Sequence, residues 1–199
     1  LTPMPLLTVW SSVERAVFVA PAIRAVVEAT APTITTSGTA VSVVPNRLEL
    51  ARCRADKLPE AEHTLALIGW NKLVKDPAWA LDVLAALRVT DERWRLLLVG
   101  EEKPSDSLAT AFSYHEELTR RIVKLKDAVE VAGFTRDIPA LLQRVGVILS
   151  TSRIEGTHEA LLQGVASGAL PVVRNWPELR RWGGPASLYP PEWVVDSPQ

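Results

Sequence analysis

The amino-acid sequence predicts an α/β protein built on a doubly wound, Rossmann-like parallel sheet. From residue 64 onward, short apolar segments alternate with helical ones in the order β-α-β-α-β-α-β-α-β. The apolar segments, such as "TLALIGW" and "WRLLLVG", are continuous runs and do not alternate with polar residues. Strands of this kind are covered by helices on both faces, which is typical of parallel sheets in α/β proteins.

Four segments precede this alternation. "RAVFVA" at residues 15–20 is short and rich in Val and Phe, as expected for a buried strand. "PAIRAVVEAT" at residues 21–30 opens with proline, which suits the first position of a helix. Residues 30–40 are rich in Thr, Ser, Pro and Gly and predict a loop, and residues 41–46 predict a strand that Pro45 ends.

The elements after residue 64 follow from apolar spacing and capping residues. Asp76 is placed to cap the helix that follows it, Asp137 is a possible cap further on, and Gly168 is expected to end the last helix. The remaining tail, residues 174–199, holds five prolines and three tryptophans and is expected to wrap over the sheet. The predicted strands are residues 64–70, 94–100, 128–133, 146–150 and 170–173, and the predicted helices are residues 75–89, 113–126, 136–145 and 157–168.

Composition excludes several classes of protein. The chain has 199 residues, of which 47% are hydrophobic, and its 22 basic and 23 acidic side chains give a formal charge of -1. Nucleic-acid-binding domains are usually basic, so no nucleic-acid partner is expected. No run of about 18 apolar residues occurs, so no transmembrane segment is expected.

The first residues and the single cysteine bear on where in the cell the protein is found. "LTPMPLLTVW" has no basic n-region and does not begin with Met, so we expect a fragment without a signal peptide. The single cysteine, Cys53, excludes an internal disulfide and fits a reducing compartment. We therefore expect a cytoplasmic protein, with attachment to a membrane surface as the alternative.

Polar and glycine residues gather where the predicted strands end. Gly69, Gly100 and Gly133 each stand at a strand end, and Lys72 and Lys75 follow the first strand of the alternation. Ligands of open parallel sheets bind at this edge, where helix N-termini favour anions. A phosphate or diphosphate ligand is the natural inference.

Other ligand motifs are absent from the sequence. No G-x-G-x-x-G follows the first strand, and no G-x-x-x-x-G-K-[ST] occurs, so neither a dinucleotide fingerprint nor a P-loop is present. The histidines at positions 63, 115 and 158 are scattered, and no Cys/His set has zinc spacing. We therefore expect no bound metal and no cofactor.

Each candidate residue also has a role that needs no ligand. Lys72 and Lys75 are equally compatible with solvated loop lysines, because most charged side chains face water. Glu155 favours a helix N-terminus electrostatically in any case. Trp70 and Trp176 are compatible with packing in the core.

Five sequence blocks, in the same order, resemble the retaining group 1 glycosyltransferases of the GT-B fold. The resemblance covers roughly residues 11–190, and the order of the blocks makes it more specific than any single block. The blocks are "VSVVPNRLEL" (V-x-V-I-P-N-G-V-D), "LIGWNKLVKDPAWALDVLAAL" (V-G-R-x-x-x-x-K-G-x-x-x-L-L-x-A), "RLLLVGEE" (L-x-I-V-G-x-G), "VEVAGFTRDIPALLQRVGVILSTSRIEG" (V-x-F-x-G … P-S-x-x-E-G) and "ALLQGVASGALPVV" (L-x-x-L-E-A-M-A-x-G-x-P-V-V).

The resemblance assigns roles to individual residues of the donor site. Lys75 matches the lysine that neutralises the donor diphosphate, and Glu155 matches the first glutamate of E-x7-E, which approaches the donor sugar. Gln163 stands where the second glutamate grips the ribose. Trp70 stands where the family has arginine, and Lys72 is a candidate for the missing charge.

The remaining residues of the expected donor site lie in loops. The resemblance implies that Gly156, Thr157 and His158 offer backbone N–H groups to the donor, and that residues 133–135 lie near its base. Glu155 and Lys75 are then the expected catalytic residues, and the expected donor-binding residues are Gly69, Trp70, Lys72, Gly100, Gly133, Phe134, Gly156, Thr157, His158 and Gln163.

By this resemblance, the chain is one half of a two-domain enzyme. Residues 1–57 are expected to form the end of the acceptor-side domain and a linker, and residues 58–199 the C-terminal domain that binds a nucleotide sugar. The implied reaction is retaining, metal-independent sugar transfer to a glycan, lipid or small molecule, with little activity expected without the remaining N-terminal domain. A catalytically weakened scaffold, favoured by Trp70 and Gln163, and a nucleotide-sugar epimerase of the same fold are the alternatives.

Overall fold

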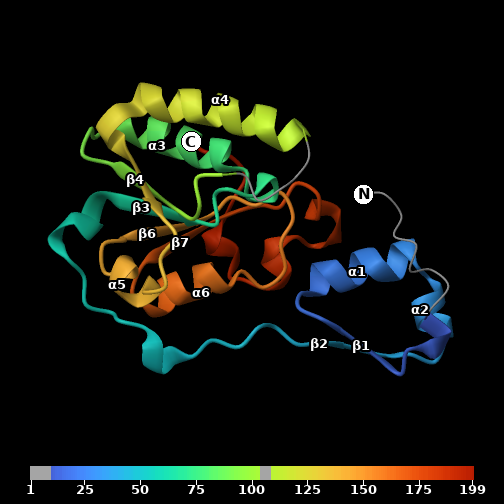
Figure 1. Ribbon diagram of the computed structural model, residues 1–199. Helices are drawn as coiled ribbons and strands as arrows, with labels where there is room; N and C mark the ends of the chain where they lie inside the picture. The colour runs from blue at the N-terminus through green and yellow to red at the C-terminus, as the bar shows by residue number, and fades with distance from the viewer. Residues whose placement is uncertain (1–9, 104–108) are drawn as a thin grey trace.

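The computed structural model describes residues 10–103 and 109–199, and over these residues it has a six-stranded parallel sheet with helices on both faces. Helices α3 (Pro77–Arg88) and α4 (Ala109–Leu125) cover one face, and α5 (Ile138–Leu142) and α6 (Glu159–Ala166) cover the other (Figure 1). This confirms the predicted fold class. The strands are β3 (Thr64–Ile68), β4 (Arg95–Val99), β5 (Val129–Gly133), β6 (Val147–Ser150), β7 (Leu170–Arg174) and β8 (Val194–Val195).

The strand order β5-β4-β3-β6-β7-β8 reverses direction at β3. The chain runs outward from β3 to β5 on one side, then returns to pair β6 with the other edge of β3. The carboxyl ends of β3 and β6 therefore lie side by side at a topological switch point. Ligands of doubly wound sheets bind in the crevice at such a point.

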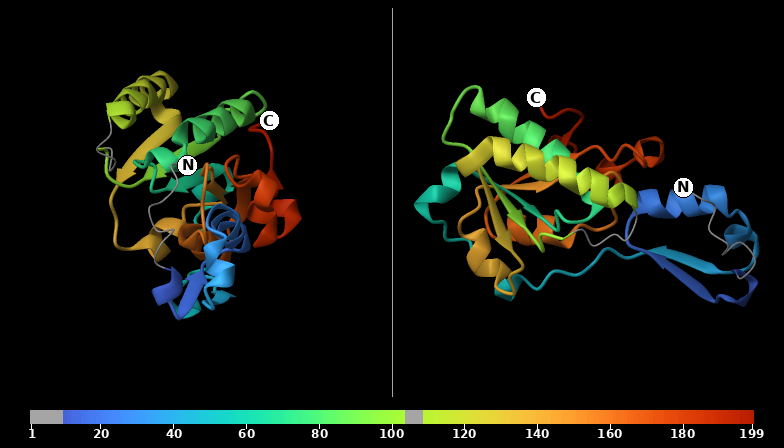
Figure 2. Two further views of the ribbon diagram at one scale, coloured as in Figure 1. Left: turned by 90° about the vertical axis from the view of Figure 1, so that its right-hand side faces the viewer. Right: turned by 45° about the horizontal axis from the view of Figure 1, so that its top comes forward.

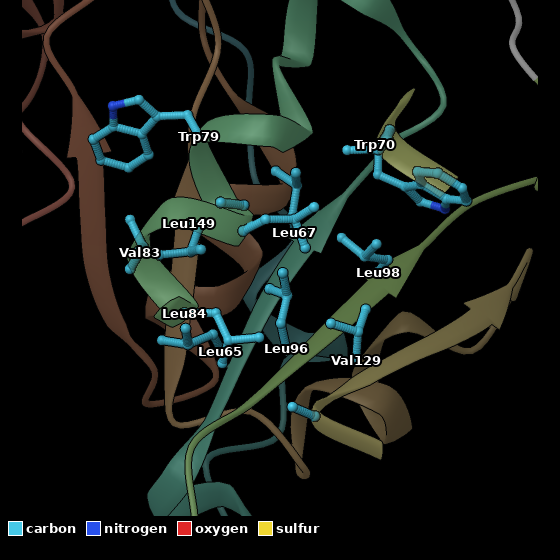
Figure 3. Close-up of a cluster of buried hydrophobic side chains, with 14 residues drawn as sticks. Leu65, Leu67, Trp70, Trp79, Val83, Leu84, Leu96, Leu98, Val129 and Leu149 are labelled. Carbon is cyan, nitrogen blue, oxygen red and sulfur yellow. The ribbon is translucent and has the colours of Figure 1, made fainter. Parts of the chain in front are cut away.

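Successive side chains of the central strands enter two different hydrophobic clusters. Leu65 and Leu67 of β3 belong to the cluster beneath α3 and α4, which Figure 3 shows, whereas Ala66 between them belongs to the cluster on the other face. Leu96 and Leu98 of β4 repeat this alternation. Burial on both faces is the physical reason for the continuous apolar runs in the sequence.

The first part of the chain forms a small unit beside the main sheet (Figure 2). Strands β1 (Arg15–Phe18) and β2 (Ala40–Val43) pair in parallel, and α1 (Pro21–Thr30) connects them, as predicted. A short helix, α2 (Thr33–Thr36), stands where a loop was predicted, because Ile34 is fully buried and fixes this segment.

The C-terminal segment wraps over the edge of the sheet, as predicted from its prolines. Trp176, Leu179 and Tyr189 are buried with Ala22 of α1 in one cluster, so this segment joins the N-terminal unit to the sheet. The two residues of β8 then add a sixth strand beside β7. So short a strand has no periodicity of its own, and it was not predicted.

Several predicted helix boundaries are wrong by a few residues. Helix α3 begins at Pro77 because residues Leu73–Lys75 form a 3₁₀ turn and Asp76 adopts left-handed backbone angles, with φ of 43°. The predicted capping bond from Asp76 is absent, and the N–H of Ala78 donates to the Tyr114 hydroxyl at 3.1 Å instead. Gly168 follows the last helix with φ of +77°, as expected for a glycine stop.

Two other observations bear on these expectations. Asp137 does cap α5, since its Oδ1 accepts from the N–H of Ala140 at 3.0 Å. Among the described residues, no helix is long and apolar enough to cross a membrane.

The close packing of α6 on β6 gives a testable prediction. A Cβ added at Gly164 would lie 2.7 Å from side-chain atoms of Ile148, which is fully buried. Gly164→Ala should lower the free energy of unfolding by about 1–3 kcal/mol through overpacking, although alanine in a helix normally stabilises by about 1 kcal/mol over glycine. Urea denaturation measures the difference.

Ile148→Ala provides the control for this prediction. Because it removes most of the colliding side chain, the double variant should lose less stability than the sum of the two single variants. An increase in stability for Gly164→Ala alone would contradict the packing at this position.

A candidate anion site at the switch point of the sheet

Two loops meet where the carboxyl ends of β3 and β6 adjoin. The Lys75 ammonium, from the turn after β3, forms an ion pair with the Glu155 carboxylate, from the loop after β6. Their side chains are only 13% and 19% exposed. The structure therefore brings together the two residues predicted to be catalytic.

The carboxylate of Glu155 is held by its own loop as well. The Ser152 hydroxyl donates to Glu155 Oε2 at 3.0 Å, and the N–H of Gly156 lies 3.3 Å from Oε1. With Lys75, these donors engage both oxygens of the carboxylate. The side chain is thus fixed in one orientation at the mouth of α6.

The two loops are also bonded through their backbones. The N–H of Arg153 donates to the Val74 carbonyl at 2.9 Å, and the Thr151 hydroxyl donates to the carbonyl of Lys75. These bonds fix the peptide of Lys75 relative to the loop that carries Glu155. The ion pair is consequently a feature of the fold and not a chance contact of long side chains.

Opposing effects act on the Glu155 carboxyl. Burial disfavours its charged form, but the Lys75 ammonium and the hydrogen bonds that the carboxylate accepts outweigh burial and lower the pKa of Glu155. The carboxylate is therefore ionised at neutral pH. A charged pair with so little exposure is stable only while both partners remain in place.

His158 is buried directly beside this pair. Its ring Nδ1 lies 2.8 Å from the Ser150 hydroxyl, and among the described residues its Nε2 has no hydrogen-bond partner. Burial and the nearby Lys75 charge lower the pKa of His158 to about 3, so the ring is neutral. The sequence predicted that the backbone N–H of His158 is offered to the nucleotide sugar. This expectation is corrected, because that backbone N–H donates to the Tyr189 hydroxyl at 2.8 Å.

A hollow of about 240 Å³ lies at the carboxyl ends of β3, β4 and β5, and one of its lining residues, Gly69, is close to the Lys75 side chain. Three of the predicted donor-binding residues line it, namely Gly69, Gly100 and Phe134. Gly69 and Gly100 have φ of +82° and +141°, values that favour glycine at these strand ends. Phe134 is 69% exposed, so much of this aromatic residue is open to solvent at the rim. Gly133 ends β5, and its carbonyl accepts from the N–H of Gly100 at 2.9 Å.

Trp70 does not belong to this open site. This residue is 3% exposed and packs in the cluster beneath α4 (Figure 3). Its indole stacks on His115, with ring centroids 5.0 Å apart. This corrects the expectation for its side chain, because an indole in the core is not available to a ligand. Lys72, on the same turn, is exposed, as expected for a candidate second cation.

Gly156 and Thr157 make a contact that the sequence did not predict. The Thr157 hydroxyl donates to the Val19 carbonyl at 2.6 Å and accepts from the N–H of Asn46 at 3.2 Å. A Cβ at Gly156 would lie 2.4 Å from Val19 Cγ2. Both residues therefore join the loop after β6 to the N-terminal unit.

Gln163 lines a second hollow, of about 270 Å³, between α5, α6 and the segment that leads to β3. Arg47, Arg52 and Arg136 also line it, and Ile138 borders both this hollow and the one at the carboxyl ends of β3, β4 and β5. The two hollows thus adjoin.

No group of three or more His, Cys, Asp or Glu residues suited to a metal ion occurs in the part of the chain that the structure describes.

Some residues around the site could not be found from sequence. Tyr114 and Tyr189 reach the two loops from α4 and from the C-terminal segment, and neither stands in a motif or at a strand end. Asp76 and Arg174 stand next to strand ends or candidate residues, but nothing in their spacing indicates that they pair, at 2.5 Å. Only the tertiary structure brings these side chains together.

Rossmann-like sheets of this kind are found in GT-B glycosyltransferases, and solved structures of such proteins resemble this chain. TarM matches with a TM-score of 0.70 at 14% identity, over 96% of this chain and 35% of that one. The pneumococcal O-GlcNAc transferase GtfA, in complex with UDP and GlcNAc, matches with 0.62 at 14% identity, over 85% and 31%. Anabaena Alr3699/HepE, in complex with UDP-glucose, matches with 0.56 at 16% identity, over 81% and 44%. The chain thus spans less than half the length of each.

The sequence comparison identifies the family. The model of the group 1 glycosyl transferases matches residues 62–192, and the chain belongs to this family. The comparison with curated proteins gives no match. The predicted membership of the group 1 glycosyltransferases is therefore confirmed.

The buried histidine predicts a pH dependence of stability. An ordinary His has a pKa of 6.5, so below that value the unfolded chain takes up a proton that folded His158 does not. The free energy of unfolding should fall as the pH drops from about 6.5 to about 5, by up to about 1.4 kcal/mol per pH unit. Urea denaturation at several pH values measures this slope.

His158→Gln is the matched variant for this measurement, because glutamine keeps hydrogen-bonding atoms but does not titrate. Its slope over the same pH range should be clearly smaller. The lowered pKa of Glu155 acts mainly below about pH 5 and is present in both proteins, so it does not produce a difference between their slopes. Parallel slopes for both proteins would show that His158 is not held neutral.

Proposed function

We propose that this chain is the donor-binding half of a glycosyltransferase that moves a sugar from a nucleotide sugar to an acceptor. The observation that carries the proposal is the Lys75–Glu155 pair at the switch point, together with the hollow lined by Gly69, Gly100 and Phe134. Membership in the group 1 family supports the same function.

In this proposal, Lys75 neutralises the donor diphosphate. Its ammonium is the one cation paired with Glu155 in the described structure, and a phosphate oxygen is an equally good partner for it. As the bond to the sugar breaks, negative charge grows on the leaving diphosphate. A positive charge already fixed nearby lowers the energy of that transition state without rearrangement.

In this proposal, the nucleoside occupies the hollow at the carboxyl ends of β3, β4 and β5. Glycine at two strand ends lets the base approach the backbone, and the exposed ring of Phe134 offers a stacking surface, which is worth about 1–3 kcal/mol for a base. UDP is the first nucleotide to test, because GtfA and Alr3699/HepE were crystallised with UDP or UDP-glucose. Gln163, across Ile138 in the adjoining hollow, is then a candidate contact of the ribose.

The finer parts of the proposal follow from the family resemblance. Transfer proceeds with retention and without a metal ion or another cofactor, and Lys75 supplies the positive charge. Residues 58–199 form the donor domain, and residues 1–57 are the end of an acceptor-side domain with its linker. The acceptor, a glycan, lipid or small molecule, binds against the missing part of that domain, in the cytoplasm or at a membrane surface.

A catalytically weakened scaffold is the second candidate. It is favoured by Trp70, which places a buried indole where the family resemblance expects a cation, and by the neutral Gln163. The two functions differ in ligand binding. Failure of the protein to bind any of UDP-, GDP- and ADP-sugars would support the scaffold.

Removal of the Lys75 charge tests the donor site directly. Lys75→Gln should weaken UDP binding about 10- to 100-fold, the usual effect of losing a charged hydrogen bond, when measured by isothermal titration calorimetry. The control is Lys124→Gln, which removes an exposed lysine from the last turn of α4 and should change the affinity less than about threefold, as an exposed charge contributes little. Equal affinities of the native protein and Lys75→Gln would contradict the assignment of Lys75.

A further inference from the structure

The carboxylate of Asp76 is held from two directions. The Tyr114 hydroxyl, on α4, donates to Asp76 Oδ1 at 2.7 Å, and Arg174 Nη1, at the end of β7, donates to Oδ2 at 2.5 Å. The side chains of Asp76 and Arg174 are only 16% and 17% exposed. A helix cap would require neither partner, and Asp76 makes no capping bond.

Arg174 is itself fixed in place. Its Nη1 also lies 3.3 Å from the Thr151 carbonyl, and its guanidinium lies 5.6 Å from the centre of the Trp79 ring. The Thr151 hydroxyl in turn donates to the carbonyl of Lys75. These contacts join three parts of the chain: the turn after β3, the loop after β6, and the end of β7. They run from Asp76 through Arg174 and Thr151 to the carbonyl of Lys75.

The backbone of Asp76 adopts an uncommon conformation. With φ of 43° and ψ of 62°, Asp76 occupies the left-handed region that residues other than glycine seldom adopt. Such a conformation persists only where surrounding contacts fix it. The Asp76 N–H donates to the Leu73 carbonyl and its carbonyl accepts from the N–H of Trp79, both at 3.1 Å, and the bonds from Tyr114 and Arg174 hold its side chain in addition.

The conformation of Asp76 determines where the preceding residue points. Lys75 ends the 3₁₀ turn, and its side chain runs past Gly69 to reach Glu155, so closely that a Cβ added at Gly69 would lie 3.8 Å from Lys75 Cε. We propose that Asp76, held by Tyr114 and Arg174, is a positioning residue that directs the Lys75 ammonium to the anion site. This inference rests on the proposed function for its purpose, since Lys75 is the cation of the proposed donor site.

The position of Lys75 can be measured without any nucleotide. An ammonium engaged in a partly buried ion pair reacts slowly with acetic anhydride, and mass spectrometry gives the rate for each lysine. We expect Asp76→Gly to raise the acetylation rate of Lys75 about fivefold or more, because Lys75 is then held less often in its charged hydrogen bond with Glu155. Glycine is chosen because it tolerates the left-handed backbone while it removes the side chain with its carboxylate.

Two further variants and two internal controls sharpen the result. Tyr114→Phe and Arg174→Gln each remove one partner of Asp76 and should each raise the rate at Lys75 by a smaller factor. Lys72 is exposed, and Lys57 donates to the carbonyls of Leu142 and Val145 at 2.9 and 2.8 Å, so neither rate should change. Asp76→Asn should restore part of the protection, because its amide oxygen can still accept from Tyr114.

Two results would overturn the inference. An unchanged rate at Lys75 in all three disrupting variants would mean that Asp76 does not position it. A rise at Lys57 together with Lys75 would mean that the contacts only stabilise the fold.

UDP titrations on the same variants test whether the position of Lys75 affects the affinity for UDP. Asp76→Gly should weaken UDP binding about five- to tenfold in the native background and by less than about twofold in the Lys75→Gln background, because its effect passes through Lys75. Equal losses in both backgrounds count against the inference. If the native protein binds no UDP or other nucleotide, the proposed function fails, while the acetylation rates still decide the role of Asp76.

Discussion

The ion pair between Lys75 and Glu155 is the interaction on which the arrangement of the site depends. Both charges are largely removed from water, and a buried charge without a partner is strongly unfavourable. The partners come from loops that are 80 residues apart in sequence. The order of the parallel strands changes direction at β3, which places the loops after β3 and β6 next to each other. The ion pair therefore depends on the strand order.

The same loop that holds Glu155 also holds the N-terminal unit. Thr157 bonds to Val19 and Asn46 on one side of the loop, and Ser152 and Gly156 bond to Glu155 on the other. Hydrogen bonds therefore connect the loop both to the N-terminal unit and to the carboxylate of Glu155. This explains why residues 156 and 157 are a glycine and a small hydroxyl residue, since close packing and two hydrogen bonds require them.

Much of the fold could be predicted from the sequence, because buried parallel strands and amphipathic helices leave strong local patterns. The whole alternation from β3 to β7 was predicted. The two residues that the family resemblance selects as catalytic, Lys75 and Glu155, lie in contact, and their role stays a prediction. The short elements α2 and β8 were missed, since packing and not periodicity fixes them. Asp137 caps its helix as predicted, but Asp76 does not, because Tyr114 and Arg174 compete successfully for its carboxylate.

The structure of the protein with UDP bound tests the central claim most directly. If Lys75 is the cation of a donor site, a phosphate oxygen of UDP will lie within hydrogen-bonding distance of Lys75 Nζ, and the uracil will occupy the hollow next to Phe134. UDP bound elsewhere, with the Lys75–Glu155 pair unchanged and the hollow empty, would contradict the claim that this pair marks the donor site.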